Sequence, residues 1–186
     1  MRLIFIYPDA YAFEEPHRKE PSKNRLTIVC HGGRSRDGIP KIKINDIRYN
    51  AADIAQRIRR WTVVSDLYSV RLAICRSADI NPYEDSLVII PALRRYPPWT
   101  TSFGSQLSLF LPNIFVRAYM GRIVTTCGPN SVWYRSALDG WQYVQNRLPR
   151  EFRIFKNLST PHYHCVVFLN GRFYRQSYNH HPPPAP

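Results

Sequence analysis

A cysteine and a histidine, each at the end of a short apolar run, are the residues of this sequence best suited to covalent chemistry. Arg25–Cys30 is a β-branched run that stops at His31, and Val70–Ile74 is a similar run that stops at Cys75. A neighbouring imidazole can take the proton of a thiol and later donate it to a leaving amine. The backbone N–H groups of Gly32 and Cys75 are candidate donors to the oxyanion that forms in such a reaction. No acidic third member is obvious.

The segment between these two runs predicts how they come together. Residues 50–61 place Ala51, Ile54 and Ile58 on one helical face, and Asn50 is a suitable N-cap. Strand, helix and strand in this order predict a βαβ unit with adjacent parallel strands. Ligands of parallel sheets bind at the carboxyl ends of the strands, and this is where we expect His31 and Cys75 to lie.

The rest of the chain predicts an α/β core followed by a β region. We expect a first strand over residues 1–7 and a charged loop over residues 8–24. Further along, we expect a helix over residues 105–111 and a strand over residues 113–119. Residues 84–96 are compatible with a further helix. Beyond residue 121, short aromatic or β-branched runs alternate with Gly, Pro and Asn, at 122–126, 131–135, 152–155, 165–169 and 172–174. Asn170-Gly171 predicts a hairpin.

We therefore expect one domain over residues 1–179. It would have an α/β core to about residue 121 and a β-rich extension over 122–179, and a disordered Pro-rich tail would follow over 180–186.

The composition is that of an ordinary globular protein. The chain has 186 residues, of which 44% are hydrophobic and 21% charged, and this argues against wholesale disorder. No apolar run approaches the roughly 20 residues of a membrane-spanning helix, and the apolar start has no signal-peptide cleavage site. Four cysteines without a Cys-x-x-Cys pair indicate neither a disulfide scaffold nor a zinc module. We expect reduced thiols in a cytosolic environment.

The positive charge is large and uneven. The chain has 26 Lys and Arg against 13 Asp and Glu, and residues 94–186 hold 11 basic but only two acidic side chains. Because Arg favours bidentate contacts with phosphate or carboxylate, an anionic partner is expected near the C-terminal half. The candidate anion-binding residues are Arg122, Arg135, Arg147, Arg150, Arg153, Lys156, Arg172 and Arg175.

The order of these segments resembles the caspase-like (clan CD) cysteine peptidases. It is most similar to the self-processing cysteine protease domains of RTX toxins and to related effectors that bacterial pathogens inject. The resemblance covers roughly residues 25–125 and rests on five stretches in order, Ile28-Val-Cys-His-Gly32, Ile42-Lys-Ile-Asn-Asp46, Ala52-Asp-Ile-Ala-Gln-Arg-Ile58, Leu72-Ala-Ile-Cys-Arg-Ser77 and Leu111-Pro-Asn-Ile-Phe-Val-Arg-Ala-Tyr-Met-Gly121. His31 and Cys75 are 44 residues apart, which suits this group.

The resemblance implies a three-layer α/β/α core with a mainly parallel sheet, Cys75 as nucleophile and His31 as general base or acid. It implies cleavage of a target protein, of the chain itself, or of both, with no cofactor needed for the chemistry. Toxin relatives are switched on by inositol hexakisphosphate at a basic surface that includes a β-flap, so this compound is the candidate allosteric ligand. A bacterial effector of this kind would reach a host or target cell without a cleavable signal peptide.

Three other hypotheses remain open. A basic α/β module without catalysis could bind nucleic acid or a phosphorylated ligand through the aromatic and basic residues of 152–156 and 172–175. The second hypothesis is a pseudoprotease, because Arg76 follows Cys75 where a small residue is expected. The third hypothesis is a metal site with His162, His164 and Cys165, completed by Cys30 or Cys127, although this spacing matches no standard zinc module. Cys30, Cys127 and Cys165 are otherwise expected to be packing residues.

Overall fold

The fold is taken from a computed structural model that describes residues 1–34, 38–79, 101–156 and 165–177. The helix expected within residues 84–96, the histidines of the metal hypothesis and the Pro-rich tail lie outside these ranges. The side chain of Lys156, one of the anion-binding candidates, is also outside the description.

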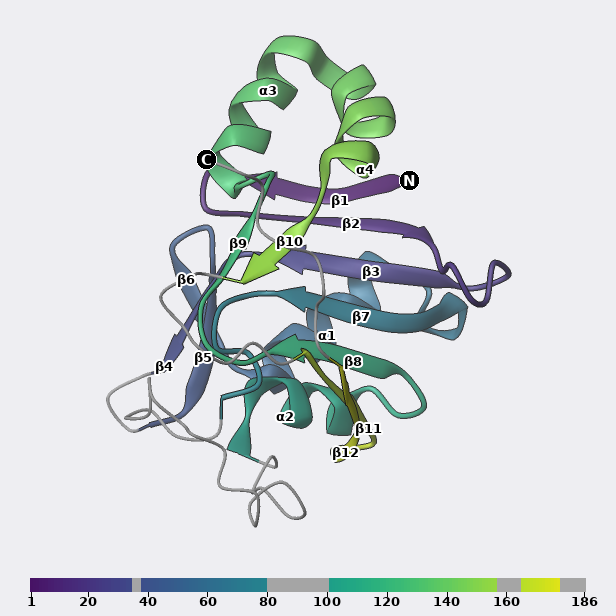
Figure 1. The fold of residues 1–186 in the computed structure, drawn as a ribbon, viewed down its shortest axis with the longest axis vertical. Helices are drawn as coiled ribbons and strands as arrows, with labels where there is room; N and C mark the ends of the chain where they lie inside the picture. Colours follow the sequence, from purple (N-terminus) through teal and green to yellow (C-terminus); the bar gives the residue numbers. More distant parts are fainter. Residues whose placement is uncertain (35–37, 80–100, 157–164, 178–186) are drawn as a thin grey trace.

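A seven-stranded mixed sheet forms the centre of the molecule (Figure 1). Its order is β1 (Arg2–Tyr7), β2 (Ala10–Pro16), β3 (Asn24–Val29), β7 (Leu67–Ala73), β8 (Phe115–Tyr119), β11 (Cys165–Leu169) and β12 (Arg172–Ser177). The expected βαβ unit is confirmed, because β3 and β7 are adjacent and parallel. β8 is parallel to β7, and every other neighbouring pair is antiparallel.

The protein is thus a mixed α/β protein, and the expectation of a mainly parallel sheet is wrong. The reason lies in the short connections at the two sides of the sheet. Two residues join β1 to β2 and two residues join β11 to β12, and such tight turns can only produce antiparallel neighbours. Asn170 and Gly171 both adopt positive φ, 51° and 76°, in the predicted hairpin turn.

The charged loop expected over residues 8–24 contains a buried strand instead. Ala10 to Phe13 in β2 are at most 1% exposed. The two acidic residues of β2 are paired within the fold, since Glu14 accepts from Arg2, Asn24 and Thr62, and Glu15 pairs with Arg25 and Arg71. Ion pairing therefore allows a sequence rich in charge to enter the sheet.

Two helices cover one face of the sheet. α1 (Ala51–Trp61) begins at Asn50, whose side chain accepts from the Asp53 backbone while the Asp53 carboxylate accepts from the Asn50 backbone. This confirms the predicted helix and its cap. The short 3-10 helix η1 (Val64–Asp66) follows, and α2 (Phe103–Phe110) packs against α1. Ile54, Ile58 and Leu107 are completely buried in this layer.

A second group of helices contributes to the core on the opposite face. α3 (Pro129–Gln142), the π-helical turn η4 (Tyr143–Arg147) and α4 (Leu148–Glu151) lie at the β1 and β2 end of the sheet (Figure 1). The strand expected at residues 131–135 is therefore wrong. Pro129 occupies the first turn of the helix, where its fixed φ is favourable, and Val132 is the residue that anchors the helix in the core. No helix among the described residues has the length and apolar character needed to span a membrane.

Two small sheets flank the central one. β4 (His31–Arg34), β5 (Pro40–Ile44) and β6 (Ile47–Tyr49) form an antiparallel meander that starts where β3 ends, so His31 to Gly33 form a strand rather than the expected turn. β9 (Ile123–Thr125) pairs with β10 (Ile154–Lys156). These two sheets border the turn that follows β7.

Candidate functional site

Cys75 lies in a tight turn just after β7. The next residue, Arg76, has a φ of +59°, a left-handed conformation that strains a residue with a Cβ. The Arg76 N–H donates to the Gly121 carbonyl at 2.7 Å, and the Ala78 N–H donates to the Tyr119 carbonyl at 2.9 Å. The turn that carries Cys75 is thus tied to the segment that leaves β8.

Gly32 is in contact with this turn. A Cβ built on Gly32 would lie 2.3 Å from the carbonyl oxygen of Cys75 and 2.6 Å from Cγ2 of Ile74. Only glycine allows the two backbones to approach so closely. The first residues after β3 and those after β7 therefore meet at one edge of the sheet, at the ends of neighbouring parallel strands.

The thiol of Cys75 is held by the backbone of β9. Its Sγ lies 3.4 Å from the Ile123 carbonyl oxygen, to which it donates, and it accepts from the Ile123 N–H at 3.5 Å. Cys75 is half-buried, whereas Cys30, Cys127 and Cys165 are buried, and all four are free thiols. Burial raises the pKa of Cys30 and of Cys127 above the ordinary value, so these two thiols are poor nucleophiles. The expectation that these three cysteines are packing residues is confirmed by their burial.

His31 lies beside the same turn but on the exposed face of β4. Its register partner is Lys43, whereas Gly32 pairs with the buried Ile42 on the other face. Among the described residues no hydrogen bond joins the His31 imidazole to the Cys75 thiol. Catalytic hydrogen bonds are often long or poorly aligned before substrate binds, and the exposed His31 side chain lies on the face of β4 opposite the Gly32 contact with the Cys75 turn.

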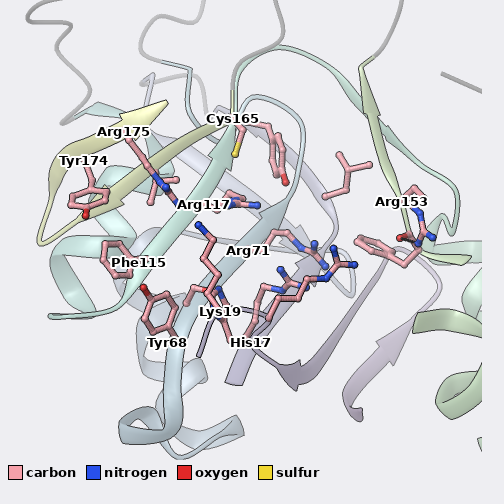
Figure 2. Close-up of a pocket in the computed structure, with 17 residues that line it drawn as sticks. His17, Lys19, Tyr68, Arg71, Phe115, Arg117, Arg153, Cys165, Tyr174 and Arg175 are labelled. Carbon is pink, nitrogen blue, oxygen red and sulfur yellow. Dashed lines mark hydrogen bonds between the residues drawn. The ribbon is translucent and has the colours of Figure 1, made fainter. Parts of the chain in front are cut away.

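A cavity of about 650 Å³ opens on the sheet face that carries β9 and β10 (Figure 2). Cationic side chains dominate its wall, and no acidic residue is part of its lining as described. The cations are Arg18, Lys19, Arg25, Arg71, Arg117, Arg153 and Arg175. Such a concentration of guanidinium groups favours a ligand with several negative charges.

Strand register explains why the arginines gather. Arg71 in β7 is directly opposite Thr27 in β3 and Arg117 in β8. Arg117 is in turn opposite Val167 in β11, whose other partner is Arg175 in β12. Because directly opposed residues share a face of the sheet, these side chains form a row across it. Figure 2 shows Arg71 and Arg117 at the centre of the cavity.

The charge in this cavity is only partly neutralised. Glu15 pairs with Arg25 at 2.7 Å and with Arg71 at 3.3 Å, and no carboxylate among the described residues pairs with Arg117. Burial, and secondly the neighbouring Arg25, lower the pKa of Arg71 to about 10. Burial and then the nearby arginines likewise lower the pKa of His17. The shift of Arg71 means that its charge is held in a partly dehydrated place beside other cations, a cost that a bound anion would offset.

Aromatic rings form another wall of the cavity. His17 lies 4.2 Å from Tyr68 between ring centroids, Tyr68 lies 5.2 Å from Phe115, and Phe115 lies 5.0 Å from Tyr174. Figure 2 shows these rings along one side of the cationic groups. The cavity thus combines cationic groups with flat aromatic surfaces.

The predicted anion-binding residues are only in part those of the cavity. Arg153 and Arg175 line it, whereas Arg122, Arg135, Arg147, Arg150 and Arg172 do not. Arg135 pairs with Glu151, and Arg147 pairs with Asp139 and Glu151. Arg25, Arg71 and Arg117 line the cavity but were not predicted, because only the strand register brings these single arginines of three strands together.

The comparisons with known proteins give no further guidance. No protein-family model matches the chain, and neither the curated proteins nor the solved structures contain a match. Among the described residues no group of three or more His, Cys, Asp or Glu side chains lies close enough to hold a metal ion. The function must therefore be inferred from Cys75, Gly32, His31 and the cationic cavity.

Proposed function

We propose that the protein is a caspase-like cysteine peptidase in which Cys75 is the nucleophile and His31 the general base and acid. The observation that carries this proposal is the contact of Gly32 with the Cys75 carbonyl at the ends of two neighbouring parallel strands. It brings the backbone next to His31 to the one cysteine that is not buried. The proposed substrate is a peptide segment of a target protein or of the chain itself.

The proposed reaction transfers an acyl group in two steps. His31 takes the Cys75 proton, and the sulfur bonds to the carbonyl carbon, with Gly32 and Cys75 N–H groups stabilising the oxyanion. The C–N bond then breaks, and His31 returns the proton to the leaving amine. Water next attacks the thioester while His31 accepts a proton from it, and Cys75 leaves as the thiol when that proton is returned. The second peptide product departs as a carboxylic acid.

We also propose that an anion in the cationic cavity regulates this thiol. β9 provides the backbone that holds Cys75, and its partner β10 contributes Ile154 to the cavity wall. A ligand that draws Arg153 and Arg71 together would displace β10, and through it β9, relative to the turn at Cys75. Inositol hexakisphosphate has the charge and the compact shape for such a role.

A digest of a proteome-derived peptide library tests the peptidase. The wild-type chain is expected to produce new peptide termini, at a rate that increases when inositol hexakisphosphate is added. Cys75→Ala and His31→Ala are expected to abolish cleavage, whereas Cys127→Ala retains it, and circular dichroism would verify that each variant folds. Cleavage by folded Cys75→Ala at the wild-type rate would rule out the peptidase proposal.

A binding module without catalysis is the second candidate, and the uncompensated arginines of the cavity favour it. In that case the protein would bind a phosphorylated ligand or single-stranded nucleic acid, with phosphates on Arg71 and Arg117 and flat rings on Tyr68 and Phe115. Binding would weaken steeply with salt and would be indifferent to Cys75→Ala. If such binding is measured and no Cys75-dependent cleavage is found, the binding module is the better account of the protein.

A further inference from the structure

A row of cations lies next to His31 on the exposed face of the β4–β5–β6 sheet. Lys43 in β5 is directly opposite His31 in β4 and directly opposite Arg48 in β6. Lys41 is opposite Gly33, so it lies on the same face. The other face is apolar, because Ile42 and Ile44 are at most 4% exposed. The strand register thus places three cations around the imidazole.

These side chains line a hollow of about 150 Å³. His31, Gly33, Lys41, Lys43 and Arg48 form its lining together with backbone neighbours. A Cβ on Gly33 would meet nothing within 4 Å, so the centre of this surface is open. A peptide side chain of moderate size therefore has room beside His31.

The hollow is positive because only one of its cations is neutralised. Lys43 pairs with Asp46 at 2.5 Å. In the described part of the chain no acidic side chain lies within ion-pair distance of Lys41 or Arg48. Two cations are therefore available to a ligand carboxylate, and both are near enough to solvent to accept one without a large desolvation cost.

The position of His31 indicates which part of a substrate reaches these cations. In the proposed reaction the imidazole donates its proton to the leaving amine, so it must lie on the side of the residues that follow the scissile bond. Lys41, Lys43 and Arg48 extend from His31 on that sheet face. Substrate residues beyond the leaving amine are therefore the ones that would cross the hollow.

We propose that the peptidase selects substrates with an acidic residue within the first three positions after the scissile bond, with Lys41 and Arg48 as the specificity-determining residues. This inference rests on the proposed function, since it needs a substrate bound at Cys75. Two exposed ion pairs predict a preference of roughly three- to ten-fold for Glu over Ala at such a position. The preference should decrease as salt is added, because exposed charges are screened.

The test uses the full chain with inositol hexakisphosphate, a peptide library and matched internally quenched peptides that differ only after the scissile bond. The wild type is expected to cleave Glu-containing peptides fastest, and Lys41→Glu/Arg48→Glu is expected to reverse the preference toward Lys-containing peptides. Arg60→Glu, an exposed cation of α1 on another surface, is the control and should keep the wild-type preference.

The outcomes separate this inference from the function on which it rests. Cys75-dependent cleavage with acidic residues enriched after the scissile bond, and reversal in the double variant, would support the inference. Cys75-dependent cleavage with no such enrichment would overturn it and leave the peptidase intact. Absence of any Cys75-dependent cleavage would overturn both.

Discussion

The close approach of Gly32 to Cys75 is the single-residue feature on which the candidate active site depends. The carbonyl of Cys75 and the side chain of Ile74 occupy the space that any Cβ at position 32 would need. Gly33 has the same sequence neighbourhood but open space at its Cβ position. The two glycines therefore form a matched pair for testing whether this contact matters.

Gly32→Ala is expected to lower the free energy of unfolding by roughly 1–3 kcal/mol, because an added methyl group forces the two backbones apart. The same displacement would move the oxyanion donors and abolish peptide cleavage. Gly33→Ala should change the free energy of unfolding by less than about 0.5 kcal/mol. Denaturant unfolding followed by a cleavage assay would measure both effects. Equal stabilities for the two variants would show that the backbones at positions 32 and 75 are not in tight contact.

At the scale of single residues, some features of the fold can be predicted from the sequence and others cannot. Asn50 as a cap and Cys30 as a core residue follow from local rules, and both are confirmed. Arg71 and Arg117 could not be found, because one charged residue in an apolar strand has no local signature. Only the register of β7 against β8 places them directly opposite each other.

At the level of elements, β9 connects the candidate active site to the cationic cavity. Its Ile123 backbone contacts the thiol, and its pairing with β10 places Ile154 at the cavity wall. The elements that the sequence predicted best, such as α1, combine a clear helical period with a cap. β2 and α3 were missed because paired acidic residues in β2 and exposed aromatic residues in α3 hide their periodicity.

Hydrogen exchange tests the connection through β9. Inositol hexakisphosphate is expected to change the exchange rate of the Ile123 amide, since this N–H donates to the Cys75 sulfur at 3.5 Å from a strand that pairs with β10. The amides of β10 at the cavity should become more protected, and those of α1 on the other face should be unaffected. Mass-spectrometric exchange with and without the anion would show this. Protection confined to β10, with β9 unchanged, would exclude this route of coupling.

The net charge of +13 is the property of the whole molecule that bears most directly on the choice of ligand. In the cavity Arg25, Arg71 and Arg117 lie close together, and one carboxylate outside the lining, Glu15, pairs with Arg25 and Arg71. The fold therefore holds like charges at close range in a partly dehydrated place. Binding of a polyanion should stabilise the whole protein, because the folded cavity gathers cations that the unfolded chain keeps apart.

Arg117→Met should raise the stability of the ligand-free protein by about 1 kcal/mol, because it removes one repelling charge and keeps the apolar stem. For a chain of this size that corresponds to an increase of about 2–4 °C in Tm. The gain in Tm on adding inositol hexakisphosphate should become smaller in this variant. Arg60→Met, an exposed position in α1, is the control. A lower Tm for ligand-free Arg117→Met would show that Arg117 is stabilised by the fold rather than by a ligand.

The most direct measurement of Cys75 as an activated nucleophile is its alkylation rate. The folded protein would be treated with limiting iodoacetamide near neutral pH, with and without inositol hexakisphosphate, and each labelled cysteine identified by peptide mass. Cys75 is expected to react faster than Cys30, Cys127 and Cys165, faster still with the anion, and much more slowly in His31→Ala. Reaction of Cys75 at the rate of a simple exposed thiol, unchanged by the anion and by His31→Ala, would contradict the proposed peptidase site.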